Sequence, residues 1–141
     1  MCSSDLICLD IERPKLQGYS SKFTDARPLQ GDATLLPVCD RSVDAVTLTL
    51  VTHHLTDLQI DLVVGEAARV LAPHGKLVVC DAIWEPSRRL GRWLWKYDRG
   101  SHPRTAEQLE AALRRRFRIV QVELFTVFHV YAMFVCEPTR T

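Results

Sequence analysis

Residues 42–83, SVDAVTLTLVTHHLTDLQIDLVVGEAARVLAPHGKLVVCDAI, predict a strand, a helix and a second strand in succession. Residues 42–51 are rich in β-branched side chains, which favour strands. From Asp57, a plausible N-cap, apolar residues recur at the spacing of one helical face: Ile60, Val63, Val64, Ala67, Val70 and Leu71. Residues 72–75 (APHG) end this helix, and residues 76–83 form another apolar run. Two strands joined by a helix predict an α/β sheet.

The segments on either side extend this pattern. Residues 6–11 (LICLDI) are a short apolar run that predicts a buried strand, and residues 29–33 predict a weaker one. Between them, residues 12–28 contain Pro14 and Gly18 and show no apolar stripe, so we expect a connector with at most one helical turn.

The second half of the chain predicts two helices and a hairpin. Residues 86–97 and 105–116 have apolar residues at helical spacing, and Thr105 to Gln108 has the pattern of a capping box. Residues 118–124 and 128–136 read as strands whose connection is too short for a parallel crossover. We therefore expect a Rossmann-like, mostly parallel open sheet that ends in an antiparallel hairpin.

Composition and charge narrow the classes of function. The chain has 141 residues and a net charge of +1, which fits one domain without the global positive field of nucleic-acid binding. The longest apolar run, residues 130–136, is too short to span a bilayer, and no signal peptide opens the chain. Five scattered cysteines match neither a disulfide framework nor a metal site. We expect a cytoplasmic protein with no nucleic-acid partner and no membrane-spanning segment.

Positive charge is concentrated in one part of the sequence. Residues 85–118 carry 10 basic and 4 acidic side chains. This excess could hold an anionic substrate or a membrane surface, or it could be the solvated face of two helices.

Acidic side chains follow several of the predicted strands. Asp10, Asp32 and Asp81 lie at or near strand ends, and ligands of open α/β sheets bind at the carboxyl ends of the strands. Asp10 could accept hydrogen bonds from ribose hydroxyls. Asp32 could accept one from an adenine amine while the Ala33 N–H donates to a ring nitrogen. Each aspartate could equally be a simple strand terminator or helix cap.

Four ordered blocks resemble one family: GDATLLP at 31–37, DRSVDAV at 40–46, HHLTD at 53–57 and EAARVLAPHGKL at 66–77. They look like the later motifs of the class I S-adenosylmethionine-dependent methyltransferases, in the ubiquinone-biosynthesis-like branch that acts on small molecules. The resemblance covers residues 6–137, and residues 98–105 look like a subgroup signature. The closing hairpin matches the antiparallel last strand of that family and disfavours a nicotinamide-dependent oxidoreductase.

The resemblance implies S-adenosylmethionine as cofactor, a small-molecule methyl acceptor, no metal, and specific residue roles. Asp10 matches the acid that binds ribose, Asp32 and Ala33 the pair that contacts adenine, and Leu50 and Val51 the strand end that flanks the methionine part. His53 and His54 follow, and a histidine with a pKa of about 6.5 could serve as a base. Alternatively, one histidine packs under the following helix and the other lines the cleft.

Aromatic residues could cover an acceptor pocket. Trp84, Trp93, Trp95 and Tyr97 are close in sequence, and aromatic rings combine apolar contact with a polar group. By spacing, Trp93 and Tyr97 suit the core, whereas Trp95 lies off the apolar stripe and is the better functional candidate. His129, inside an apolar run, suits a core position. Trp95 and Tyr97 are the residues we assign to the acceptor.

The family also has a first strand and a glycine-rich loop before the position of Leu6. The six glycines of this chain are too far apart to write either common phosphate-binding glycine motif. We therefore expect a methyltransferase domain over residues 7–141 that is truncated at its amino terminus. Residues 1–6 would be a non-native leader, because MCSSDL back-translates to the end of a sequencing-library adapter. The alternative is a non-catalytic, methyltransferase-like binding module.

Overall fold

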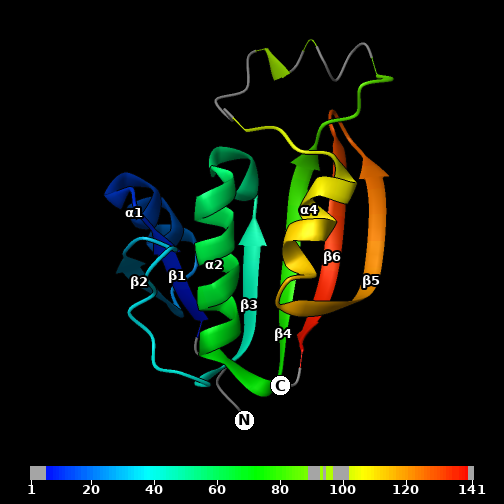
Figure 1. Ribbon diagram of the computed structural model, residues 1–141. Coiled ribbons are helices and arrows are strands. Elements are labelled where there is room, and N and C mark those ends of the chain that lie inside the picture. Colours follow the sequence, from blue (N-terminus) through cyan, green and yellow to red (C-terminus); the bar gives the residue numbers. More distant parts are fainter. Residues whose placement is uncertain (1–5, 89–92, 94, 97–101, 140–141) are drawn as a thin grey trace. The chain divides into compact units, whose positions relative to one another are not determined.

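The computed structural model describes residues 6–88, 93, 95–96 and 102–139 (Figure 1). The chain divides into two compact units, Met1–Pro37 and Val38–Thr141. Each unit is presented by itself.

The first unit is a two-stranded parallel sheet with one helix. Strand β1 (Leu6–Asp10) is followed by α1 (Arg13–Lys22) and β2 (Ala26–Gln30). Leu6 lies opposite Ala26 and Asp10 opposite Gln30, so both strands end at the same edge. This β–α–β order makes the two strands parallel, but the prediction of a buried strand over residues 6–11 is wrong, because Leu6 and Ile7 are 50% and 42% exposed.

The helix α1 corrects the expectation of a mere connector over residues 12–28. Pro14 lies in its first turn, where a missing N–H costs little, and the amides of Lys15 and Leu16 donate to the Glu12 carbonyl. Only Leu16 of this helix is buried. A helix that buries a single side chain leaves no apolar stripe in the sequence, which is why periodicity did not detect it.

The second unit is a four-stranded sheet in the order β3-β4-β6-β5. The strands are β3 (Val43–Thr49), β4 (Leu71–Ile83), β5 (Phe117–Thr126) and β6 (Val130–Pro138). Strands β3 and β4 are parallel, whereas β6 runs antiparallel to both β4 and β5. The predicted terminal hairpin is confirmed, but the sheet is mixed rather than mostly parallel, because both pairings of β6 are antiparallel.

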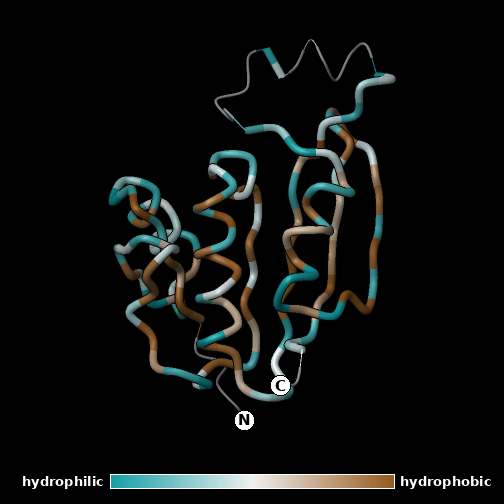
Figure 2. Tube along the Cα trace, viewed as in Figure 1, coloured by the Kyte–Doolittle hydropathy of each residue, from teal (hydrophilic) through white to brown (hydrophobic). Residues whose placement is uncertain are grey.

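Two helices pack against this sheet. They are α2 (Asp57–Val70) and α4 (Ala106–Leu113), which contact each other and the strands (Figure 1). The N-cap of α2 is Thr56 rather than Asp57, and its side chain and that of Gln59 form a capping box. Both helices bury the apolar faces that their spacing predicted. Figure 2 shows apolar residues in brown at intervals along both helices.

The core of the second unit lies between these helices and the sheet. Its fully buried side chains include Leu77, Val79, Leu109, Leu113, Phe117 and Phe134. Strand β4 begins at Leu71, earlier than predicted, and Gly75 lies where a Cβ atom would come within 2.7 Å of the Leu71 side chain. That close approach explains the glycine. Among the described residues, no helix has both the length and the apolar character needed to cross a membrane.

Candidate functional site

Asp10 and Asp32 lie at the same edge of the first unit. Asp10 is the last residue of β1, and Asp32 follows the end of β2. The Gly31 amide donates to the Asp10 carbonyl at 3.2 Å, which ties the two strand ends together. The structure thus places both aspartates where the carboxyl ends of parallel strands meet.

Each of these carboxylates is partly engaged by its own turn. Oδ1 of Asp10 accepts from the Glu12 amide at 2.8 Å, and Oδ1 of Asp32 accepts from the Thr34 amide and hydroxyl at 2.8 Å each. These bonds, the backbone one first, lower the pKa of Asp32. Among the described residues, neither Oδ2 atom accepts a hydrogen bond. Two charged acceptors at one strand edge fit the hydroxyls and amine of a nucleoside.

Leu50 follows β3 in an uncommon backbone conformation. Its φ is 55°, in the left-handed region that favours glycine, and its amide donates to the Cys80 carbonyl at 2.9 Å. The side chain is exposed. Val51, the next residue, is the N-cap of the short 3-10 helix η1 (Thr52–His54). The turn therefore redirects the chain from β3 into the segment that carries both histidines.

Asp81, a residue of β4, is a fully buried carboxylate that hydrogen-bonds to this segment. Its Oδ2 accepts from the amide and hydroxyl of Thr52, both at 2.6 Å. Its Oδ1 pairs with Nδ1 of His53 and also accepts from the Ala82 amide. Four donors on one carboxylate make Asp81 the centre of a polar cluster inside the unit.

The protonation of this cluster follows from its contacts. Burial acts to raise the pKa of Asp81, but the hydrogen bonds from His53 and Thr52 outweigh it and hold that pKa below its ordinary value. An ionised carboxylate can only accept, so the proton between the two side chains belongs on Nδ1 of His53. The orientation of the imidazole is fixed as a result.

The two histidines occupy different environments. His53 is buried, and its ring contacts Trp95 edge-on with centroids 5.8 Å apart. His54 is exposed, although the two histidine rings lie 4.1 Å apart. His53 is therefore the inner and His54 the outer of the two rings.

Trp95 is buried rather than exposed in a pocket. Besides His53, its ring meets Trp84 at 6.3 Å and His129 at 5.2 Å. Trp93, which spacing assigned to the core, is instead exposed. The helix predicted at 86–97 and the acceptor candidate Tyr97 lie outside the described residues, apart from positions 86–88, 93 and 95–96.

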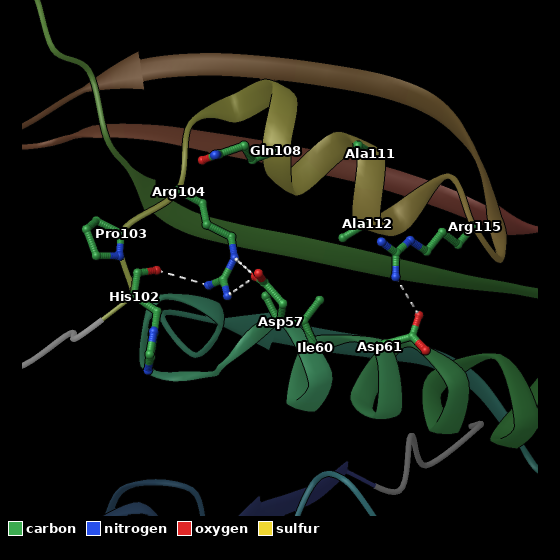
Figure 3. A pocket seen from close by; sticks show the side chains of 10 residues that line it. All are labelled: Asp57, Ile60, Asp61, His102, Pro103, Arg104, Gln108, Ala111, Ala112 and Arg115. Atoms are coloured by element: carbon green, nitrogen blue, oxygen red, sulfur yellow. Dashed lines mark hydrogen bonds and ion pairs between the residues drawn. The ribbon is translucent and has the colours of Figure 1, made fainter.

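Arg104 lies in the subgroup signature at residues 98–105, but the sequence assigned it no role. Its guanidinium donates to the carbonyls of Thr52 at 3.0 Å and Leu55 at 2.8 Å, and it pairs with Asp57 at 2.7 Å. The His102 amide also donates to the His53 carbonyl at 3.0 Å. Arg104 thus holds η1 and the start of α2 against the segment that precedes α4. Figure 3 shows its pairing with Asp57. The sequence feature that pointed to Arg104 is the subgroup signature to which it belongs.

A groove of about 540 Å³ opens between α2 and α4. Figure 3 shows its lining: Asp57, Ile60, Asp61, His102, Pro103, Arg104, Gln108, Ala111, Ala112 and Arg115. Its charges are paired, Arg104 with Asp57 and Arg115 with Asp61. The groove contains none of the residues predicted to bind cofactor. Within the described parts of the chain, no three His, Cys, Asp or Glu residues gather to hold a metal ion.

Comparison with known sequences identifies the family. The family model described as a methyltransferase domain matches residues 1–79, more than half of the chain. The demethylmenaquinone methyltransferase of Mycobacterium sp. (strain KMS) is 37% identical over 82 residues, which cover 58% of this chain and 35% of that protein. The corresponding enzyme of Mycolicibacterium paratuberculosis is 39% identical over 82 residues, covering 57% and 34%. The chain therefore spans about a third of the length of these relatives.

Solved structures agree on the fold. An S-adenosylmethionine-dependent methyltransferase from Methanosarcina mazei superposes with a TM-score of 0.83 at 14% identity, covering 95% of this chain and 82% of that one. LepI in complex with S-adenosylmethionine gives 0.76 at 16% identity, covering 96% and 36%. With the family match, these findings confirm the resemblance seen in the sequence blocks. The chain belongs to the methyltransferase domain family, in the class I fold whose methyl donor is S-adenosylmethionine.

Proposed function

We propose that this chain provides the cofactor-binding and catalytic part of an S-adenosylmethionine-dependent methyltransferase that acts on a small-molecule acceptor. The observation that carries the proposal is the pair of ionisable strand ends, Asp10 and Asp32, held at one edge by the bond between Gly31 and Asp10. The names of the curated relatives, demethylmenaquinone methyltransferases, support an apolar, quinone-like acceptor.

The proposed cofactor contacts use the acceptor atoms described above. Asp10 accepts hydrogen bonds from the ribose hydroxyls, Asp32 accepts one from the adenine amine, and the Ala33 amide donates to the adenine ring. Leu50 and Val51, at the end of β3 in the second unit, keep their assignment by resemblance to the methionine part. When bound, S-adenosylmethionine supplies an already electrophilic methyl group, so these residues contribute mainly proximity and orientation.

Of the two histidines, we assign the base to His53. Asp81 keeps the Nδ1 proton on His53 and orients the ring, so His53 accepts a proton from the acceptor at Nε2. His54, which is exposed, lines the site beside it. Trp95 contacts His53 edge-on, and we propose that it supports the imidazole rather than covering the acceptor. Tyr97 keeps its sequence-based assignment to the acceptor.

We further propose that full cofactor binding requires a strand with a glycine-rich loop, as the family resemblance implies. Two observations support this. Among the described residues, β1 pairs only with β2 and β3 only with β4, so each strand has one edge open. In addition, the widely spaced glycines of this sequence offer no loop that a pyrophosphate-like or amino-acid group could approach closely.

Calorimetric titration with S-adenosylhomocysteine tests both the cofactor binding and the need for the glycine-rich loop. The titration is made into this chain and into an extended version that carries a first strand and glycine-rich loop of the family at its amino terminus. We expect the extended protein to bind and this chain to bind more weakly. Equal binding by both would remove the need for the loop, and binding by neither would favour the non-catalytic module.

Two matched substitutions in the extended protein test the site itself. Asp32→Ala should weaken binding by about tenfold or more, because a charged acceptor is lost. Asp25→Ala, which removes an exposed aspartate in the turn before β2, should leave binding unchanged. Equal affinity for the two variants would remove Asp32 from the site.

A further inference from the structure

Thr52 uses all three of its polar atoms to join separate parts of the second unit. Its amide and its hydroxyl both donate to Oδ2 of Asp81 at 2.6 Å, and its carbonyl accepts from the Arg104 guanidinium at 3.0 Å. The residue is 5% exposed. Because Thr52 directly precedes His53 in η1, the contacts that fix Thr52 also fix the backbone from which the His53 side chain extends.

The carboxylate of Asp81 depends on its donors for its orientation. The torsion about the Cβ–Cγ bond of an aspartate is broad, so the backbone does not set the plane of the two oxygens. Oδ1 of Asp81 receives Nδ1 of His53 and the Ala82 amide. Both donors that the structure describes at Oδ2 come from Thr52. Thr52 therefore holds the oxygen that the histidine does not use.

A side chain at this position could serve only to fill space, and valine would then do so equally well, since it has the shape of threonine. The hydroxyl adds a donor to a carboxylate that is already paired with a histidine. We propose that Thr52 is a positioning residue for His53: its hydroxyl holds Oδ2 of Asp81 so that Oδ1 faces Nδ1, which leaves Nε2 aimed in one direction. The inference rests on the proposed function, in which Nε2 of His53 accepts the proton of the methyl acceptor.

NMR of the imidazole ring nitrogens tests the proposal on this chain, without cofactor or acceptor. The nitrogen shifts report which ring nitrogen of a neutral histidine carries the proton, and the signals missing from His53→Gln are those of His53. At about pH 9, where histidine is neutral, we expect the wild type to carry the proton on Nδ1. In Thr52→Val, the tautomer protonated on Nε2 should appear beside it. The Nδ1 proton should also exchange with solvent about tenfold faster, because one hydrogen bond that fixes the carboxylate is lost.

Thr52→Ser separates the hydroxyl from the space that Thr52 fills. If the hydroxyl positions the ring, Thr52→Ser keeps the tautomer of the wild type while Thr52→Val loses it, even if both variants are less stable. The reverse result, or identical tautomers in both variants and the wild type, would overturn the proposal. The matched control is Thr47→Val, at an exposed position of β3, which should leave the His53 signals unchanged. Circular dichroism checks that each variant is folded.

Failure of this proposal and failure of the proposed function give different results. An unchanged tautomer in Thr52→Val removes the positioning role of Thr52 and leaves cofactor binding by the extended protein untouched. Absence of cofactor binding in the calorimetric titration removes the proposed methyl transfer instead. The tautomer of His53 would still differ between Thr52→Val and Thr52→Ser in that case, since no cofactor is present in the NMR experiment.

Discussion

Asp81 illustrates how one buried carboxylate positions a segment of chain. It accepts from Thr52, His53 and Ala82 and is fully buried. In Asp81→Asn, the side-chain NH₂ group cannot accept a hydrogen bond and faces at least one of these N–H or O–H donors. At least one hydrogen bond is therefore lost and replaced by an unfavourable contact between two donors. We expect the free energy of unfolding to fall by about 3 kcal/mol, measured by denaturant titration. The control Asp44→Asn, at an exposed position of β3, should have little effect.

The pH dependence of stability gives a second readout for the same residue. Because the folded-state pKa of Asp81 is below its ordinary value of 3.8, its stabilising effect is present above that pH and is lost as the pH falls through the folded pKa. The stability difference between the wild type and Asp81→Asn should therefore narrow below about pH 4. A difference that stays constant down to pH 2 would show that ionised Asp81 does not stabilise the fold.

Leu50 carries backbone strain that glycine would relieve. With φ at 55°, Leu50→Gly should raise the free energy of unfolding by up to about 1 kcal/mol, since the exposed side chain contributes little packing. Leu62→Gly, at a similarly exposed leucine in the interior of α2, should lower it by about 1 kcal/mol. Thermal denaturation of both variants should show a higher melting temperature for the variant at Leu50 and a lower one for the variant in α2. If both are destabilised alike, Leu50 is not strained.

At the level of the elements, Arg104 joins η1, the start of α2 and the segment before α4. Arg104→Ala leaves the carbonyls of Thr52 and Leu55 without these donors, so stability should fall by about 2 to 3 kcal/mol. Arg104→Lys should restore only part of the loss, because an ammonium cannot match the planar set of donors. Arg114→Ala, which removes an exposed pair with Glu110, serves as control and should change little.

Hydrogen exchange shows where the loss in Arg104→Ala occurs. The amides of Thr52 to Leu55 should exchange faster in this variant, whereas those in the middle of β4 should keep their protection. Uniformly faster exchange through the whole unit would contradict the assigned role as a connection between elements.

Elements differ in how well the sequence predicted them. The spacing of Ile60, Val63 and Val64 predicted α2, because a helix that buries a whole face needs that repeat. Helix α1 was missed, since it buries only Leu16. Trp95 was assigned to a pocket because it lies off a helical stripe, yet contacts with His53 and His129 bury it. Those two partners are distant in sequence, so local periodicity could not reveal them.

Across the whole molecule, the two units differ in their expected stability. The first unit has a two-stranded sheet, and Leu16 is its only buried apolar side chain among the described residues. The second has a four-stranded sheet with a large core. We expect the amides of β1 and β2 to exchange much faster than those of β4 and β6, because two-stranded sheets are marginal by themselves. Similar protection in both units would contradict this.

The sequence by itself determined the order of most elements, the antiparallel hairpin and the family. These depend on local periodicity, turn length and short ordered blocks such as residues 66–77, all of which can be read along the chain. Only the tertiary structure decided that Asp81 and His53 pair and that Arg104 holds η1 in place. Both contacts join residues at least 28 positions apart in the sequence. Their partners are chosen by strand register and burial, which no local pattern encodes.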